Sequence, residues 1–376
     1  MNTRFIKPRA GEQKPLQTAS PTCRGWIRRA IATFPLVCAC YTALAQYTAL
    51  TLPNGYVQVE GDIITTEDKA AQLIADKQGI RHSYTTYAPS RLWPNRVVPF
   101  EFDPGVSASQ RLIFLTAMAW WSNSFPGVVT ISFTPRTSEA GYVRLEVKDL
   151  GFGFSGGSTD YIGYSGSRVT ITITPDSVRV GLIAHELGHA LGLWHEQSRA
   201  DRDSYVTINY GNITFPYSLQ FDKDSPQSTF GDYDYGSIMH YSACAFSTSS
   251  SCNCSDPQGQ TITSPFPAQQ CNMGQRGALS EMDKRGMAFT FAPPEWKFLY
   301  NKSGSRSDGS FQNPFQVLAA ATALPANSTL WLGPGTIPAA GVTLSTPMVL
   351  KAAIADLQLQ PDGSLGPRQT GYATLQ

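Results

Sequence analysis

The feature that most constrains this 376-residue chain is the run HELGHALGLWH at positions 185–195. Histidines four positions apart lie on one face of an α-helix, roughly 5–6 Å apart at Cβ, so the imidazoles of His185 and His189 can reach one metal ion. Gly192 can adopt a positive φ, which would end the helix and turn the chain back to bring in His195. The run therefore predicts a helix and a turn that place three histidines around one metal ion.

Zinc is the metal that this ligand set indicates. Three protein ligands leave a fourth coordination position for water, which distinguishes a catalytic zinc site from a closed structural one. Glu186, next to the first histidine, can act as general base toward that water. An exposed amphipathic turn is the alternative, but three of the five histidines in the chain fall within this run. We therefore predict one catalytic zinc ion per chain, held by His185, His189 and His195.

A second motif, SIMHY at positions 237–241, makes the interpretation more specific. The chain resembles the astacin family of metzincin zinc metalloproteases, which join the long zinc-helix motif to a later turn that contains methionine. The glutamate that follows the third histidine, Glu196, is also typical of astacins. The resemblance covers residues 92–291 and implies an α+β fold, namely a two-subdomain protease with a twisted mixed sheet and a zinc-binding helix.

The resemblance also implies roles for single residues. Met239 would form a hydrophobic floor beneath the zinc ion. Tyr241 would be a loose fifth ligand that swings away and hydrogen-bonds the tetrahedral intermediate. Glu196 would receive the new N-terminus after processing, and an extended substrate would pair with an edge strand of the sheet. Taken alone, Met239 would be ordinary core packing and Tyr241 a half-buried aromatic side chain.

Residues 1–45 have the composition of an export signal. Three arginines at positions 24–29 precede an uncharged stretch at 30–44, and an A-x-A cleavage site closes it at 43–45. The stretch is too short and too interrupted for a membrane span, and no other segment is long enough. We therefore expect a secreted protein without a stable membrane span. A lipid anchor at Cys40 is the alternative.

Residues 46–91 are predicted to be a propeptide that contains the sequence VEGDI at positions 59–63. This segment resembles the F-x-G-D box of astacin propeptides, and the resemblance implies that Asp62 binds the zinc ion and displaces the catalytic water. A carboxylate is a competent zinc ligand, and Gly61 would let the backbone approach closely. Val59 departs from the phenylalanine of the box, and a solvated turn is the alternative.

The propeptide is also expected to contain the site of activation. A short helix is predicted at residues 65–78. Beyond it, Arg81 and Arg91 offer cleavage sites to a trypsin-like activating protease. Cleavage at either position would separate Asp62 from the enzyme.

The catalytic domain is predicted at residues 92–293 as a mixture of strands and helices. Apolar and polar residues alternate in its central strands, so one face of each should be buried. Pro99 favours an edge strand or a bulge, Ser107 begins a capping box, and residues 175–177 should cap the zinc helix. Strands are predicted at 97–102, 128–133, 142–147 and 169–173, an irregular glycine-rich loop at 151–166, and helices at 107–121, at the zinc motif and from 279–283.

Four cysteines lie beyond the predicted signal, at positions 244, 252, 254 and 271. They allow three pairings, and an even set agrees with export to an oxidising compartment. A second zinc site is the alternative, but C-x-C without C-x-x-C partners is poor zinc-finger spacing. Two local disulfides are favoured. This departs from the astacin pattern, in which one of two usual bridges ties distant parts of the domain together.

Residues 294–376 are predicted to be a small β-rich segment. They resemble the first coils of right-handed parallel β-helix proteins, with short strands at 329–332, 342–344 and 348–351, and are either a partly disordered appendage or a working module. The net charge of +1 and the scattered basic residues argue against nucleic-acid binding.

These observations together predict a secreted zinc endopeptidase that is made as a latent zymogen and cleaves proteins or peptides. The alternative is a non-catalytic surface or glycan-binding factor that uses the C-terminal segment. The oligomeric state is left open.

Overall fold

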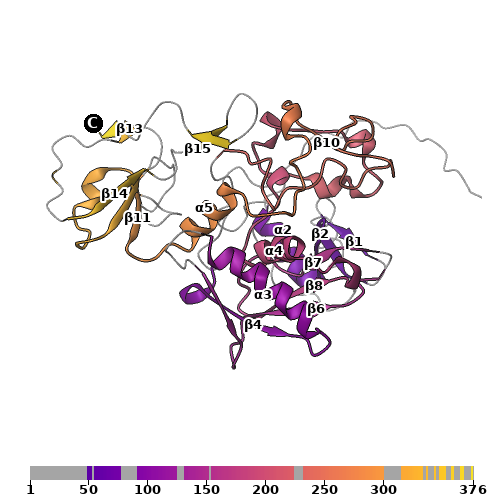
Figure 1. Ribbon diagram of the computed structural model, residues 1–376, viewed down its shortest axis with the longest axis horizontal. Helices are drawn as coiled ribbons and strands as arrows, with labels where there is room; N and C mark the ends of the chain where they lie inside the picture. The colour runs from indigo at the N-terminus through magenta and orange to yellow at the C-terminus, as the bar shows by residue number, and fades with distance from the viewer. Residues whose placement is uncertain are drawn as a thin grey trace, which may run out of the picture. The chain divides into compact units, whose positions relative to one another are not determined.

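The computed structural model describes residues 49–52, 55–77, 91–124, 131–151, 154–223, 232–299 and 315–332, and short segments between 336 and 375 (Figure 1). The predicted signal at 1–45, including Cys40, lies outside the described residues, as does Arg81. Within these ranges, no helix is both long and apolar enough to cross a membrane.

A mixed sheet of eight strands draws on both the predicted propeptide and the predicted catalytic domain. In spatial order its strands are β1 (Leu50–Thr51), β2 (Val57–Glu60), β3 (Ile63–Thr65), β7 (Gly157–Thr159), β8 (Arg168–Ile173), β6 (Tyr142–Val147), β4 (Val97–Phe102) and β5 (Ser132–Pro135). The last four strands of this order run parallel to one another. Strand β7 is antiparallel to β8 and parallel to β3. The α+β class with a mixed sheet is therefore confirmed.

Strands that were predicted from alternation form the middle of this sheet. Val143 and Leu145 of β6 are fully buried, and so are Val169, Ile171 and Ile173 of β8. A period of two places such side chains on one face of a strand, where they can join a single core. The alternation therefore predicted both the strands and the faces that they bury.

Three segments differ from the prediction. The strand expected at 128–133 is β5, which runs from Ser132 to Pro135. The strand with Pro99 is internal rather than an edge, because β4 lies between β6 and β5. Pairing with β6 begins at Phe100, so the missing N–H of Pro99 precedes that ladder. Part of the predicted glycine-rich loop forms β7, because β3 and β8 pair with it on either side.

The described residues form four α-helices: α2 (Glu67–Lys77), α3 (Ala108–Ser122), α4 (Val180–Ala190) and α5 (Glu281–Thr290). Helix α3 begins with the predicted capping box, in which the side chains of Ser107 and Gln110 each accept a hydrogen bond from the other residue's backbone N–H. Helices α3 and α4 lie side by side (Figure 1). Between them, Trp121 Nε1 donates a hydrogen bond to the Ala184 carbonyl (2.8 Å).

Helix α4, which carries the zinc motif, begins differently from the prediction. Pro175–Ser177 forms a separate 3-10 turn, and Asp176 accepts a hydrogen bond from the Thr174 hydroxyl (2.6 Å). The N-cap residue of α4 is Arg179, whose side chain makes no capping hydrogen bond. The predicted cap is therefore wrong. Every residue of the helix after Val180 is buried, so tertiary packing rather than a cap stabilises it.

Beyond α4 the chain is mostly turns, as predicted. A two-stranded sheet joins β9 (Thr207–Ile208) to β10 (Ile262–Thr263) beside a second, aromatic-rich core. The disulfides Cys244–Cys252 and Cys254–Cys271 are both local. They confirm the favoured pairing against a second zinc site. Short 3-10 turns lie at Pro94–Arg96, Glu196–Ser198, Arg202–Ser204, Tyr210–Asn212, Tyr217–Phe221 (η7), Pro267–Gln269 and Leu318–Ala321.

The C-terminal segment contains a parallel sheet of β11 (Trp296–Leu299), β12 (Thr329–Leu332) and β14 (Val349–Ala352). The last two strands match the strands predicted at 329–332 and 348–351, whereas most of 342–344 lies outside the described residues. Two small strand pairs also lie among the described residues of the segment: β13 (Thr336–Ile337) with β17 (Thr374–Leu375), and β15 (Leu357–Leu359) with β16 (Leu365–Pro367).

Candidate metal centre

The three histidines of the zinc motif converge on one point. His185 and His189 lie one turn apart on α4, and His195 follows a turn at Gly192. The φ of Gly192 is +109°, as predicted for a residue that must reverse the chain. Its N–H donates to the His189 carbonyl (2.7 Å) and closes the helix. The ligand atoms of the three histidines and of Asp62 all lie within 4.8 Å of one another.

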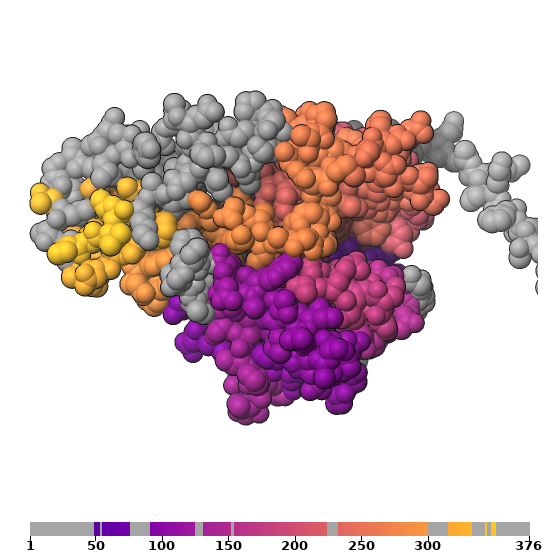
Figure 2. Space-filling model, in the orientation of Figure 1, coloured from indigo at the N-terminus to yellow at the C-terminus, as the bar shows by residue number. Residues whose placement is uncertain are grey.

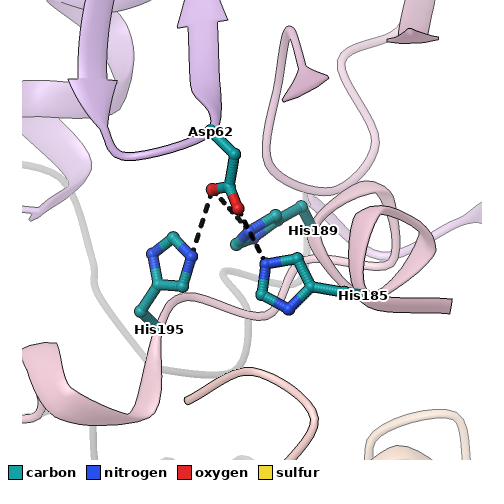
Figure 3. Close-up of side chains that lie close together, drawn as sticks. All are labelled: Asp62, His185, His189 and His195. Atoms are coloured by element: carbon teal, nitrogen blue, oxygen red, sulfur yellow. Dashed lines mark hydrogen bonds and ion pairs between the residues drawn. The ribbon is translucent and has the colours of Figure 1, made fainter. Parts of the chain in front are cut away.

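Asp62 lies at the turn between β2 and β3 and points into the space between the three imidazoles (Figure 3). Its Oδ2 is 2.9 Å from His185 Nε2, and its Oδ1 is 3.2 Å from His189 Nε2 and 3.1 Å from His195 Nε2. Burial alone would raise the pKa of this carboxyl, but the three histidines outweigh burial and hold the pKa well below its usual value. An ionised carboxylate therefore faces all three ring nitrogens.

The donor set fits a zinc ion. His185 Nδ1 donates to the Ile238 carbonyl and His189 Nδ1 to the Leu193 carbonyl, both at 2.7 Å, which leaves Nε2 as the ligand atom of each neutral ring. The Nε2 atoms of His189 and His195 are buried and make no hydrogen bond to any described residue. Three such nitrogens and one carboxylate oxygen are the ligands of a tetrahedral zinc site.

Glu186 is buried beside these ligands. Its Oε2 accepts a hydrogen bond from the Thr159 hydroxyl (2.6 Å), and its Oε1 has no hydrogen-bond partner among the residues described. Burial and, after it, the charge of Asp62 raise the pKa of Glu186 well above its usual value. Thr159 belongs to β7, the strand that the sequence did not reveal, so its role was missed as well.

Met239 and Tyr241 both lie at the site. Met239 packs beneath α4 at Gly188, where an added Cβ would lie 2.5 Å from the methionine sulfur. The ring centroid of Tyr241 is 4.4 Å from that of His195. The Tyr241 hydroxyl is buried and makes no hydrogen bond within the described residues. A Cβ at Gly61 would lie 2.0 Å from this hydroxyl, so the turn before Asp62 requires a glycine.

Side chains on both sides hold the turn between β2 and β3. Gln58 Nε2 donates to the Gly61 carbonyl, and the Gly61 N–H donates to Gln220 Oε1 in η7 (2.5 Å). The Ser198 hydroxyl donates to Glu60, which is fully buried. On the face drawn in Figure 2, only a small indigo area of the N-terminal described residues is visible. Glu60 lies within the VEGDI segment that the sequence singled out, whereas nothing in the sequence pointed to Gln220.

Glu196 belongs to a buried polar cluster next to the site. Its Oε1 accepts a hydrogen bond from the Asp234 N–H (2.9 Å) and lies 3.3 Å from Arg199. Burial raises the pKa of Glu196 to about 7. The approach of a processed N-terminus to Glu196 stays a prediction.

Comparison with known proteins identifies the family of this chain. Residues 85–292, more than half of the chain, match the model of the peptidase family Astacin. The chain belongs to the astacin family. Its three histidines are the zinc site typical of astacins.

Two curated relatives match similar shares of this astacin. Zinc metalloproteinase dpy-31 of Teladorsagia circumcincta is 32% identical over 238 residues, which cover 61% of this chain and 36% of the relative. Blastula protease 10 of Paracentrotus lividus is 34% identical over 233 residues, which cover 60% of this chain and 37% of the relative. The chain thus matches little more than a third of either relative.

A solved structure is also similar to this astacin. It is that of high choriolytic enzyme 1, a hatching enzyme zinc-protease from the medaka fish Oryzias latipes, with 29% identity and a TM-score of 0.46. The match covers 55% of this chain and 96% of that chain.

Proposed function

We propose that this astacin is the precursor of a secreted zinc endopeptidase that hydrolyses peptide bonds in proteins, and that Asp62 keeps the precursor inactive. The observation that carries the proposal is the Asp62 carboxylate between the three zinc histidines. It lies within 3.2 Å of all three Nε2 atoms. A carboxylate there would occupy the fourth coordination position, which a catalytic zinc site must leave for water.

The residues around the site suit peptide hydrolysis. When bound, zinc polarises the scissile carbonyl and lowers the pKa of the attacking water. Glu186 takes the proton of this water and passes it to the leaving amine, and its hydrogen bond from Thr159 keeps the carboxyl aimed into the site. The Tyr241 hydroxyl donates to the oxyanion of the tetrahedral intermediate.

Latency has a second component in the sheet. In the precursor, β3 lies along one side of β7 and pairs with it at Ile63 and Thr159. Removal of residues 46–91 would leave that side of β7 open, next to Glu186. An extended substrate could then add to the sheet by strand pairing. The propeptide thus covers both the metal and the strand that would hold a substrate.

Secretion is proposed from the N-terminal composition and from the cysteines. Residues 1–45 combine arginines, an uncharged stretch and an A-x-A site. The two disulfides at Cys244–Cys252 and Cys254–Cys271 are typical of proteins that fold in an oxidising compartment.

The test compares the uncut precursor with its Asp62→Ala variant, both loaded with zinc, for hydrolysis of casein. The wild-type precursor should be nearly inactive, and the variant should be active without cleavage because the fourth coordination position is open to water. Asp68→Ala, an exposed aspartate of α2, is the control and should stay latent. Zinc-loaded, folded Asp62→Ala protein without activity would contradict the latency proposal. If the processed protein also binds zinc without hydrolysing casein, the non-catalytic alternative holds.

A further inference from the structure

The two ring nitrogens of each zinc histidine face different parts of the chain. The Nε2 atoms face the metal position, and two of the Nδ1 atoms donate to backbone carbonyls of the catalytic domain, at Ile238 and Leu193. His195 differs, because its Nδ1 lies 3.0 Å from Glu60 Oε2. The domain therefore supplies the outer contacts of two histidines, and the propeptide supplies a charged group to the third.

Burial and a hydrogen bond hold Glu60 in this position. Both Glu60 and His195 are almost completely buried, and a buried carboxylate requires partners to offset the loss of hydration. The Ser198 hydroxyl donates to Glu60 Oε1, which leaves Oε2 toward the imidazole. Glu60 Oε2 lies 3.0 Å from His195 Nδ1, although the two atoms are not aligned as a hydrogen bond. A carboxylate at this distance favours a proton on Nδ1 and raises the basicity of Nε2 as a metal ligand.

We propose that Glu60 is a positioning residue for His195 which the precursor supplies and the processed enzyme loses, so that the precursor retains zinc more firmly. The inference rests on the proposed function and is separate from the blocking role of Asp62. Asp62 acts on the metal position itself, whereas Glu60 acts through the opposite side of a ligand ring. The propeptide would then hold the metal in the site during secretion as well as suppress activity.

The experiment measures how fast zinc leaves the uncut precursor. Precursor with one equivalent of zinc is mixed with an excess of a chromogenic chelator, and zinc transfer is followed at constant pH. Glu60→Gln keeps the size of the side chain and removes its charge, and it should release zinc about tenfold faster than wild type, since loss of an outer-shell partner lowers metal affinity by roughly 10–100-fold. Glu67→Gln, an exposed glutamate at the start of α2, is the matched control and should release zinc at the wild-type rate.

Two further measurements separate metal positioning from simple attachment of the propeptide. Uncut Glu60→Gln precursor should stay as inactive on casein as wild type, because Asp62 is still present. After processing, the wild-type and variant precursors yield the same polypeptide and must release zinc equally fast. Equal release from the two uncut precursors would overturn the proposal. Faster release together with loss of latency would also overturn it, because Glu60 would then only anchor the turn.

A second variant keeps the proposal testable if Glu60→Gln does not fold. Ser198→Ala removes the hydroxyl that orients Glu60 and should speed zinc release from the precursor but not from the processed protein. Equal rates of zinc release from the wild-type and Ser198→Ala precursors would count against the proposal. A wild-type precursor that binds no zinc, or a processed protein that cleaves no casein, would instead contradict the proposed function.

Discussion

Two polar side chains at this site are each held by a second group behind them. His185 is held by the carbonyl of Ile238, and Glu186 by the hydroxyl of Thr159. Such outer contacts fix the tautomer of a ring and the direction of a carboxylate before substrate arrives. Predictions at this scale therefore concern groups that act without being zinc ligands.

The first prediction concerns Glu186→Gln in the processed enzyme. The change removes proton transfer but no zinc ligand, so zinc should stay near one equivalent while turnover of casein falls by several orders of magnitude. Metal analysis and initial rates measure the two quantities. Glu281→Gln, an exposed glutamate of α5, is the control. Activity of the Glu186 variant above about a tenth of wild type would remove Glu186 from the role of base.

The second prediction concerns Tyr241→Phe. Because its hydroxyl is buried and has no hydrogen-bond partner among the described residues, it is available to a substrate oxyanion. Its loss should lower kcat more than it raises KM. Steady-state kinetics on a peptide substrate separate the two constants, with Tyr210→Phe, a half-exposed tyrosine, as control. An unchanged kcat would mean that Tyr241 only packs against His195.

At the scale of elements, the turn between β2 and β3 has no space for a side chain at Gly61. Gly61 has a positive φ and lies against the Tyr241 hydroxyl. Gly61→Ala should push the turn out of the site and raise the activity of the uncut precursor, measured on casein. Gly55→Ala is a matched control, since Gly55 also has a positive φ but no heavy atom lies within 4 Å of an added Cβ. Equal latency of both variants would show that the turn tolerates the methyl group.

Helix α5 supports the methionine-containing turn at the metal centre through the residues at its start. It begins with Ser280 and Asp283 in a capping box. Asp283 also accepts hydrogen bonds from the Ser237 hydroxyl (2.7 Å) and the Ile238 N–H (2.8 Å). Because the Ile238 carbonyl in turn accepts from His185, the start of α5 positions the methionine-containing turn and, through it, a zinc ligand.

At the scale of the whole molecule, α5 also contacts the C-terminal sheet. Phe289 is 1% exposed, and its ring centroid lies 5.3 Å from that of Phe298 and 5.2 Å from that of Trp331. A chain that ends at Pro293 should keep its activity after processing, because no described site residue lies beyond α5. It should melt several degrees lower, since each aromatic pair contributes about 0.5–1.5 kcal/mol and 1 kcal/mol corresponds to roughly 2–4 °C at this size.

Circular dichroism melts and casein assays of the processed proteins test this expectation. A chain that ends at Ala352 keeps β11, β12 and β14 and should melt like the 376-residue chain. Equal melting temperatures for the chains that end at Pro293 and at Ala352 would mean that the C-terminal sheet adds no stability to the protease.

The sequence by itself determined the chemistry of the metal centre and the elements whose pattern is local. The spacing of His185, His189 and His195 follows from helix geometry, and the turn that brings in the third histidine follows from Gly192. The alternation in β6 and β8, the capping box of α3 and the local disulfides could likewise be predicted from neighbouring residues, because these interactions join positions close in the chain. The resemblance to astacins also predicted that Asp62 lies close to the three histidines, which the structure confirms.

Only the tertiary structure decided what depends on contacts between distant segments. Strand β7 forms because it pairs with β8 along Gly157–Thr159, and Pro99 is tolerated in an internal strand because β6 begins its pairing one residue later. The sequence placed Glu60 in the predicted propeptide segment but gave it no role of its own. Folding buries its carboxylate against His195, a residue far away in the chain. Such contacts join residues far apart in the chain and follow no periodic pattern. They therefore cannot be predicted from the sequence and form only when the elements pack together.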